Sequence, residues 1–386
     1  MSQSPLRIAI LTHSTNPRGG VVHALALGEA LVALGHEAVV HAPDAGGEGF
    51  FRAARCGTVC LPASPFAGDT FAMVEARIGD YLEHFETCAH RRFDLFHAHD
   101  GISGNALASL KQRGLIDAFA RTVHHVDSFE DNRLNTLQMR SILSADRHFV
   151  VSDYWRGKLA RDIGIAAAVV GNGVDTSFFT PIRDGGEAAL VRRLGLGRGP
   201  VFLSIGGIEE RKNSIRILQA FAQVQAVIPS AQLVIAGGAS VLDHTAYQAE
   251  FEQTMNELRL LPGMVVQTGP VPQAEMAVLY RIAAALVFPS LKEGFGLAVI
   301  EAMACGVPVA TSHIRPFTDY LDAGDALWCD PLSSGSIADA MVAATRSPQR
   351  ESLVARGLAV AARHSWAETA RAHLPTYRAL GARQHA

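Results

Sequence analysis

Cysteines are sparse in this chain and have none of the spacings that commonly bind metals. The five, Cys56, Cys60, Cys88, Cys305 and Cys329, are odd in number and include no Cys-x-x-Cys pair. Cys56 and Cys60 are close enough to form a metal pair, but no second Cys/His pair at ligand spacing accompanies them. We therefore expect free thiols in a reducing compartment, and no resident metal.

Long apolar runs and a strong excess of one charge are also missing. No run of 18 apolar residues occurs, so no segment is predicted to span a membrane. The formal net charge of −3 argues against a dedicated nucleic-acid binder, which usually carries a basic excess. The first apolar segment begins at Leu6, which leaves no room for a signal peptide before it. We expect a cytoplasmic protein without a nucleic-acid partner, and peripheral membrane contact stays open.

Two ligand-binding signatures are absent as well. Leu6–Thr12 is an apolar run typical of a parallel strand, and a helix is expected over Val21–Leu34. The loop between them carries Gly19-Gly20 but no Gly-x-Gly-x-x-Gly, so no dinucleotide site is expected there. No Asp-x-Asp occurs in the chain, which agrees with chemistry that needs no metal ion.

What the chain does contain is a regular alternation of short apolar strands and helices. Hydrophobic residues make up 48% of the 386 residues and charged residues 18%, which is enough apolar material for two cores. The alternation predicts parallel sheets covered by helices on both faces. Between residues 183 and 200, glycine and charged residues interrupt it. The expected fold class is α/β, with doubly wound domains over residues 1–182 and 198–365.

The first half also contains a long expected helix, a last strand and one stretch without an assignment. A helix is expected over Phe71–Arg91, and Phe149–Ser152 is interpreted as the last strand of this half. The stretch Asp44–Ser64 is rich in glycine, and its pattern gives no secondary-structure assignment.

The stretch Pro289–Val309, which reads PSLKEGFGLAVIEAMACGVPV, is the most informative in the chain. It predicts a glycine-interrupted loop and then a helix over Leu297–Cys305, which Gly306 and Pro308 end. A buried strand is expected before the loop and another after the helix. A helix N-terminus approached by glycines presents free N–H groups and a partial positive charge, which suits a phosphate.

Two glutamates frame the start of this helix. Glu293 lies in the loop and Glu301 about one turn into the helix, so both are expected to face the same crevice. Carboxylates accept hydrogen bonds from the vicinal hydroxyls of a ribose or a hexose. The alternative is a solvated glutamate beside an ordinarily capped helix.

This pair of glutamates, with Gly-Phe-Gly between them, resembles the donor-site signature of family 4 glycosyltransferases, which have the GT-B fold. The resemblance implies that Glu293 contacts sugar hydroxyls and that Glu301 holds the ribose. By the same resemblance, Val271 lies in a segment that flanks the nucleotide base. The backbone amides that would face sugar and phosphate are those of Gly294, Phe295, Gly296 and Leu297.

The cations expected on the diphosphate depart from the family's pattern. The family has Gly-Arg after the first strand of the second domain and a Lys some residues later, and Lys212 matches that Lys. Gly207 stands where the Arg is expected. Because adjacent residues in a helical turn point about 100° apart, we expect Lys212 to be the principal contact. Arg211 would be a solvated or weaker neighbour, and Arg18 is a further candidate.

The first half resembles the same family at fewer positions. Gly19-Gly20 matches a glycine loop that borders the diphosphate and the acceptor, with a structural turn as the alternative. The Thr-x-His that ends at His124 resembles the place of an active-site histidine near the transferred sugar. His125 would then be its neighbour on the opposite face. Residues 366–386 resemble a C-terminal helix that packs back on the first domain.

For the whole chain, the resemblance implies a retaining, metal-independent hexosyltransferase that moves a sugar from a UDP- or GDP-sugar to an acceptor hydroxyl. It implies two Rossmann-like domains facing across a cleft, the first on the acceptor side and the second binding the nucleotide sugar. The acceptor would be a small molecule, a glycan or a lipid-linked sugar, and no cofactor is expected besides the donor. His124, Lys212 and Glu293 would be the catalytic residues.

Two other functions stay open at this point. One is an epimerase of the same fold, which would convert a nucleotide sugar without an acceptor. The other is a nucleotide-sugar-binding protein without catalysis, because the arginine expected at position 207 is missing.

Overall fold

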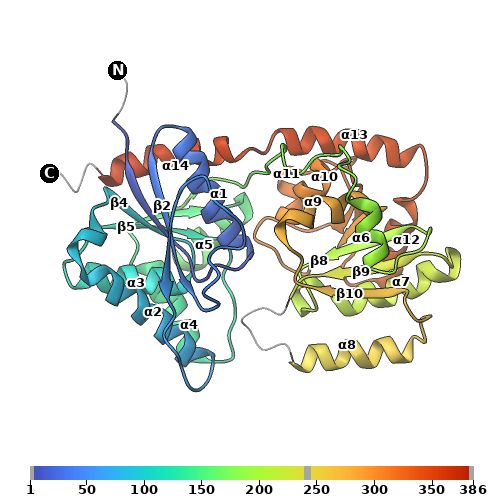
Figure 1. The fold of residues 1–386 in the computed structure, drawn as a ribbon, viewed down its shortest axis with the longest axis horizontal. Helices are drawn as coiled ribbons and strands as arrows, with labels where there is room; N and C mark the ends of the chain where they lie inside the picture. The colour runs from blue at the N-terminus through green and yellow to red at the C-terminus, as the bar shows by residue number, and fades with distance from the viewer. Residues whose placement is uncertain (1–3, 239–244, 382–386) are drawn as a thin grey trace. The chain divides into compact units, whose positions relative to one another are not determined.

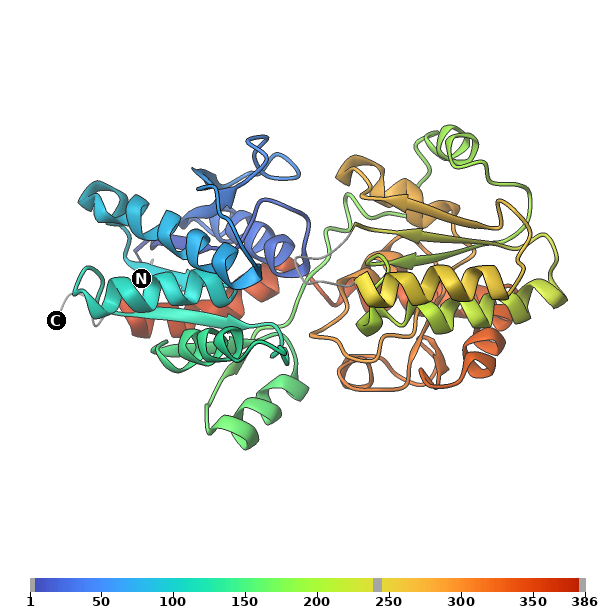
Figure 2. The ribbon, with the colours of Figure 1, turned by 90° about the horizontal axis from the view of Figure 1, so that it is seen from below.

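The computed structural model describes residues 4–238 and 245–381. Contacts within the chain divide it into two compact units, residues 1–172 with 366–386 and residues 173–365. In each unit a sheet lies between layers of helices (Figures 1 and 2).

This division differs in detail from the boundaries expected from the sequence. It places residues 173–182 with the second unit, whereas the sequence pattern put the end of the first domain at 182. The helix expected over 366–386 spans Trp366–Gly381, and residues 382–386 lie outside the described part of the chain.

The first unit alternates strands and helices along the chain. Its elements are β1 (Arg7–Leu11), α1 (Gly19–Ala33), β2 (Glu37–Asp44), β3 (Gly57–Pro62), α2 (Thr70–Glu86), η1 (Cys88–Arg91), β4 (Leu95–Ala98), α3 (Gly101–Gln112), β5 (Phe119–Val123), α4 (Asn132–Leu143), β6 (Arg147–Val150), α5 (Asp153–Ile163), β7 (Ala168–Val169) and α14 (Trp366–Gly381). Over the described residues, the strand order is β3-β2-β1-β4-β5-β6-β7, and every pairing is parallel.

The two faces of this sheet bury separate apolar clusters. Because side chains alternate along a strand, Ile8 and Ile10 of β1 pack with α1 and α14, whereas Ala9 and Leu11 pack with α2 and α3. All four side chains are fully buried, and burial of each Ile or Leu contributes about 1.5–3 kcal/mol. Figure 1 shows α14 lying beside α1, so the C-terminal helix is part of the first unit's core.

The second unit repeats the alternation. Its elements are α6 (Glu187–Arg193), β8 (Val201–Ile205), η2 (Glu210–Lys212), α7 (Ser214–Val227), β9 (Gln232–Ala236), α8 (Thr245–Glu257), β10 (Val265–Gly269), α9 (Gln273–Ile282), β11 (Ala285–Phe288), α10 (Leu297–Ala304), β12 (Val309–Ser312), α11 (Phe317–Tyr320), β13 (Leu327–Cys329), α12 (Ser334–Ala343) and α13 (Gln349–Ala362). The strand order within the described residues is β10-β9-β8-β11-β12-β13, again all parallel.

Helices α7, α8 and α12 bury one large apolar cluster against this second sheet. Phe202 of β8, Phe221 of α7 and Phe251 of α8 are fully buried in it. Figure 2 shows α7 and α8 side by side in this unit. Helix α10 contacts β11 and β12, and it also packs on α9 and α13.

Each sheet has one place where the strand order reverses, between β1 and β4 in the first unit and between β8 and β11 in the second. In doubly wound sheets, ligands bind outside the carboxyl ends of the strands at this switch point. Gly19 and Gly20 follow β1, where they are the first two residues of α1 and not part of the preceding loop as expected. Lys212 and Glu293 follow β8 and β11. The fold therefore puts candidate residues at both switch points.

Several expectations about the elements are corrected by the structure. Phe149–Ser152 is not the last strand of the first half, because β7 follows it and pairs with β6. The helix expected over Phe71–Arg91 ends at Glu86, and a short 3₁₀ turn follows. The unassigned stretch Asp44–Ser64 contains β3, whose mostly exposed residues at the sheet edge give no apolar pattern.

Candidate active site

The turn after β8 is held in place by Asn213. This residue has a left-handed backbone, with φ +64°, and it ends the 3₁₀ turn η2. Its Nδ2 donates hydrogen bonds to the carbonyl oxygens of Pro289, at 3.0 Å, and Pro331, at 2.7 Å. The loop after β8 is thereby fixed to the loop after β11, which carries Glu293.

Lys212 and Arg211 both reach the carboxylate of Glu293. Lys212 Nζ lies 2.7 Å and Arg211 Nη1 lies 2.8 Å from the same oxygen, Oε1. Lys212 Nζ is also 4.3 Å from the centroid of the Phe288 ring, within range of a cation–π contact. Residues 211 and 212 were expected to face one group equally only if their loop were irregular. Their loop is irregular, since it is a short 3₁₀ turn that ends at the left-handed Asn213, and both long side chains converge on Glu293.

The charges of this group are strongly coupled. Burial alone would raise the pKa of Glu293, which is 7% exposed, but Lys212 and Arg211 hold that pKa down to about 2. Glu293 is therefore ionised at neutral pH. Burial lowers the pKa of Lys212, and the charge of Glu293 opposes this effect. Two cations are thus held beside one carboxylate, at the start of a helix.

Gly207 is a glycine for steric reasons. It has φ +77°, and a Cβ there would lie 2.9 Å from the carbonyl oxygen of Gly238. A Cβ on Gly237, in the neighbouring loop, would in turn lie 2.6 Å from the Gly207 nitrogen. The turns after β8 and β9 approach too closely for any side chain at position 207. The resemblance implied an arginine at this position, and the structure instead has Arg211 of the next turn beside Glu293.

We expect Gly207→Ala to destabilise the chain by more than Gly263→Ala. Both glycines have nearly the same backbone, φ +77° and +79°, but a Cβ on Gly263 meets no described atom within 4 Å. Left-handed strain costs about 1–2 kcal/mol at either position, and crowding adds about 1–3 kcal/mol at Gly207. Urea unfolding of the two variants measures the difference. Gly207→Arg is expected to unfold more easily still, and a gain of activity in it would contradict the steric account.

Packing under the Gly-Phe-Gly loop determines its shape. Phe295 is 5% exposed, and its ring stacks on Tyr320 with centroids 4.6 Å apart. Gly296 has φ +98°, and a Cβ there would lie 2.6 Å from the Phe317 ring. The side chain of Phe295 is therefore a packing residue, and only its backbone can meet a ligand. Leu297 begins α10, and N–H groups in the first turn of a helix have no acceptor inside it.

Glu301 has a less polar setting than Glu293. Tyr280, from α9, donates a hydrogen bond from its hydroxyl to Glu301 Oε2 at 2.8 Å. Burial raises the pKa of Glu301 to about 7, and the hydrogen bond from Tyr280 opposes this only in part. The structure thus groups Glu293 with the two cations and Glu301 with a tyrosine.

In the first unit, Gly20 and His124 lie together. A Cβ on Gly20 would be 3.4 Å from His124 Cδ2, and His124 Nε2 lies 3.2 Å from His99 Nδ1. Burial lowers the pKa of His124 well below its ordinary value. The ring is therefore neutral at pH 7 and can accept or donate a hydrogen bond without carrying charge. His124 and His125 follow the end of β5, and His125 is exposed and lies 3.0 Å from Asp127.

Three further buried histidines of the first unit, His23, His97 and His373, lie close to His99 and His124 and to one another. His97 lies 2.6 Å from the Tyr377 hydroxyl and 2.8 Å from the Thr122 hydroxyl. The ring of His23 lies 5.9 Å from that of His373. Burial lowers the pKa of all three histidines, to about 4 for His23 and about 3 for His373. As neutral rings, they join α1 and β4 to α14 inside the first unit.

The residues expected from the sequence lie in both units. In the second unit, Lys212 contacts Glu293, and Glu301 contacts Tyr280 instead. The other expected residues of this unit follow β10 and β11 and begin α10; they are Val271, Gly294, Phe295, Gly296 and Leu297. In the first unit, Gly20 lies beside His124, and Gly19 precedes Gly20 in the chain. The sequence did not indicate that Arg211 shares Glu293 with Lys212, or that Tyr280 pairs with Glu301.

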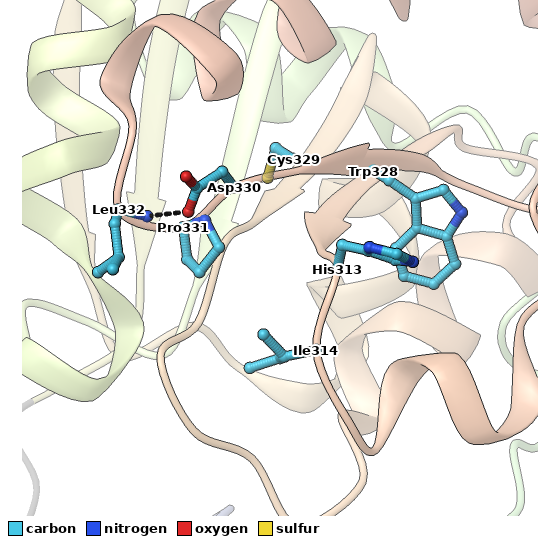
Figure 3. Close-up of a pocket in the computed structure, with 7 residues that line it drawn as sticks. All are labelled: His313, Ile314, Trp328, Cys329, Asp330, Pro331 and Leu332. Carbon is cyan, nitrogen blue, oxygen red and sulfur yellow. Dashed lines mark hydrogen bonds between the residues drawn. The ribbon is translucent and has the colours of Figure 1, made fainter.

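A separate hollow lies beyond the carboxyl ends of β12 and β13, as Figure 3 shows. It measures about 510 Å³, and none of the expected site residues lines it. The rings of His313 and Trp328 lie beside each other in its wall, with centroids 5.1 Å apart. Its lining consists of His313, Ile314, Trp328, Cys329, Asp330, Pro331 and Leu332.

The described residues also bear on membrane spans, metal sites and disulfides. Over residues 4–238 and 245–381, no helix combines the length and apolar character needed to cross a bilayer. Over the same residues, no three His, Cys, Asp or Glu side chains come together as a metal site. All five cysteines are free thiols.

Two doubly wound parallel units, with a cation pair and a helix N-terminus at the switch point of the second, define a class of enzymes that bind a nucleotide's phosphates. The pattern of the family described as glycosyl transferases group 1 matches residues 190–370. The pattern of glycosyltransferase family 4 matches residues 17–178. The chain belongs to this family of GT-B glycosyltransferases, and it is a hexosyltransferase with a sugar-nucleotide donor.

One curated relative supports this membership, and two solved structures have a similar fold. The chain is 30% identical over 314 residues to a D-inositol 3-phosphate glycosyltransferase of Frankia alni, and the match covers 74% of each chain. The sucrose-phosphate synthase of Thermosynechococcus elongatus has a similar fold, with a TM-score of 0.80 at 24% identity, covering 98% of this chain and 99% of that one. Anabaena HepE, solved in complex with UDP-glucose, gives a TM-score of 0.76 at 17% identity, covering 97% and 100%.

Proposed function

We propose that this chain is a retaining hexosyltransferase that moves a sugar from a UDP- or GDP-sugar to a hydroxyl of its acceptor without a metal ion. The observation that carries the proposal is the convergence of Lys212 and Arg211 on Glu293. This group lies after β8 and β11, just before the N-terminus of α10.

The cation pair favours binding of the leaving group. A nucleoside-diphosphate sugar carries about two negative charges on its diphosphate. Lys212 and Arg211 bring two positive charges beside the one negative charge of Glu293, so the three side chains together stay positive. N–H groups at the start of α10 add a partial positive charge. Charge that develops on the departing diphosphate is then stabilised by fixed groups of the protein, which is the role that a metal has in other transferases.

In this proposal Glu293 binds the hexose of the donor. With its pKa held to about 2, it is a carboxylate at all working pH values and accepts hydrogen bonds from hexose hydroxyls. The acceptor oxygen attacks the anomeric carbon from the side that the diphosphate leaves, so the anomeric configuration is retained. The bond from the anomeric carbon to the phosphate oxygen breaks, and the acceptor's proton passes to that oxygen. No protein nucleophile takes part in this scheme.

Proteins similar to this chain indicate the kind of donor and acceptor. HepE was solved with UDP-glucose, and the Frankia relative is named for D-inositol 3-phosphate. These names support a hexose donor on a nucleoside diphosphate. They also support a sugar or polyol acceptor, free or on a larger glycan or lipid.

A binding and turnover panel tests the function. UDP-, GDP- and ADP-sugars are added to the full chain, and the unfolding temperature is recorded. A ligand present at 100 times its dissociation constant should raise stability by about 2.7 kcal/mol. The nucleotide sugar that binds is then incubated with and without polyol and glycan acceptors. Product that forms without any acceptor would indicate an epimerase, and binding without product from any acceptor would indicate a binding protein.

We expect the product to keep the donor's anomeric configuration and to form in the presence of EDTA. The reason is that Lys212, Arg211 and α10 already provide positive charge for the diphosphate. Nuclear magnetic resonance of the product determines its configuration, and a magnesium titration after EDTA treatment is the control. An inverted product, or activity that EDTA abolishes and magnesium restores, would overturn this scheme.

A further inference from the structure

Helices α9 and α10 are joined by a hydrogen bond between two side chains with few other polar neighbours. The Tyr280 hydroxyl donates to Glu301 Oε2 at 2.8 Å. Tyr280 is fully buried, and its ring packs edge-on against Phe179 with centroids 5.8 Å apart. A buried tyrosine packed in this way cannot rotate away from its partner. It therefore fixes the end of a glutamate side chain that would otherwise have several rotamers.

Glu301 differs from its partner in being only half-buried. Within the part of the chain that the structure describes, Tyr280 is the side chain that donates to its carboxylate. An ionised carboxylate can accept about four hydrogen bonds, so this one is short of donors. Glu293, by contrast, has two cations as hydrogen-bond partners. Glu301 is thus equipped to accept hydrogen bonds from a ligand.

Building on the nucleotide-sugar function proposed above, we propose that Tyr280 is a positioning residue for the donor nucleotide. Its hydroxyl holds Glu301 Oε2 and leaves Oε1 for the vicinal hydroxyls of the ribose. Tyr280 itself does not touch the nucleotide in this arrangement. Tyr280 acts by orienting the Glu301 carboxylate and by keeping it ionised, because a hydrogen bond to an ionised group favours the ionised form.

The proposal makes donor affinity depend on pH in a defined direction. Burial raises the pKa of Glu301 to about 7, so the group is largely protonated in the free protein below pH 7. A ribose that donates to the carboxylate binds its ionised form, so binding expels this proton. Affinity is therefore expected to fall as pH drops below 7, by up to about tenfold per pH unit, and to level off above it.

Other groups near Glu301 do not titrate in that range. From α9 these are Tyr280, whose pKa burial raises well above its ordinary value, and Arg281, which is paired with Asp184 and Glu187. Directly after α10 it is Cys305, whose thiol pKa is raised by burial to about 12. Helix α13 meets α10 where Gly357 lies against Met303, and its Arg350 donates a hydrogen bond to the carbonyl oxygen of Ala284, just after α9. An arginine stays protonated throughout this pH range. A transition near pH 7 in donor affinity therefore reports Glu301.

The experiment measures dissociation constants of UDP-glucose and GDP-mannose by calorimetry between pH 5.5 and 8.5. Intact nucleotide sugars are used because free nucleotides end in a phosphate that itself titrates near pH 6. The chains compared are wild type, Tyr280→Phe and Glu301→Gln. Tyr377→Phe is the matched control, since Tyr377 is also a fully buried tyrosine with a hydroxyl partner, in the first unit.

For Tyr280→Phe we expect the midpoint of the pH dependence to move up by about one unit. Its affinity should then be several-fold weaker than wild type at pH 7 and nearly equal at pH 8.5. Glu301→Gln should bind about tenfold more weakly, with no pH dependence in this range. Tyr377→Phe should keep the wild-type profile. Unfolding temperatures of all four chains show that each is folded.

Two results would overturn the inference in different ways. If Tyr280→Phe has the wild-type midpoint, Tyr280 does not act on Glu301, and the proposed function stands without it. If wild type binds neither nucleotide sugar at any pH, the proposed function fails and this inference fails with it.

Discussion

Lys212→Ala is expected to lower both sugar transfer and nucleoside-diphosphate affinity at least tenfold, equivalent to about 1.4 kcal/mol. The Lys212 side chain is 12% exposed and lies 2.7 Å from Glu293. Its removal takes away one of two cations and leaves a buried carboxylate with one partner fewer. Steady-state kinetics with the bound donor, and calorimetry with UDP and GDP, measure the two losses.

Arg211→Ala should cause a smaller loss than Lys212→Ala in both assays. The Arg211 side chain is 35% exposed and also pairs with Glu209, so the screened charge contributes less. The double variant is expected to lose less than the two single effects combined, because both cations share one carboxylate. Arg193→Ala, which removes a surface ion pair with Glu275 in the same unit, is the control. If Lys212→Ala stays near wild type in both assays, the diphosphate is held by other groups.

Much of the fold could be predicted because its strands are short, continuous apolar runs. The strand expected in the apolar run Leu6–Thr12 is β1, Arg7–Leu11, and the helix expected over Leu297–Cys305 is α10, Leu297–Ala304. Elements that lie at an edge were not predicted. Strand β3 is largely exposed, and α8 buries only Phe251 among its described residues, so neither shows the periodicity that a buried face imposes.

For the candidate site, the sequence could indicate single residues but not their contacts. Glu293, Glu301 and Lys212 could be named because each belongs to a local motif. The partnership of Tyr280 and Glu301 could not, because it joins two helices across 21 residues and Tyr280 looks like a core aromatic in its helix. Arg211 was expected to be a solvated or weaker neighbour of Lys212, because a regular helical turn would point the two apart. Local spacing indicates which residues carry chemistry, and only the packed structure shows which of them share a partner.

Glu293→Ala and Glu301→Ala are expected to separate sugar transfer from nucleotide binding. Removal of Glu293 leaves Lys212 and Arg211 without their shared carboxylate, so both stay available to a free diphosphate. Affinity for UDP or GDP should therefore be kept or improved, while transfer falls because the hexose loses a charged acceptor. One such hydrogen bond is worth about 1.5–3 kcal/mol, or about 10- to 150-fold in rate.

Removal of Glu301 should instead weaken free nucleotide and nucleotide sugar alike, because both contain the ribose. Calorimetry with UDP or GDP and with the matching nucleotide sugar, together with transfer rates, distinguishes the two variants. Glu293→Gln is a useful companion, since it keeps the shape of the side chain and removes the charge that Lys212 and Arg211 balance. Equal losses of free-nucleotide affinity in Glu293→Ala and Glu301→Ala would show that the two carboxylates do not divide the donor between sugar and ribose.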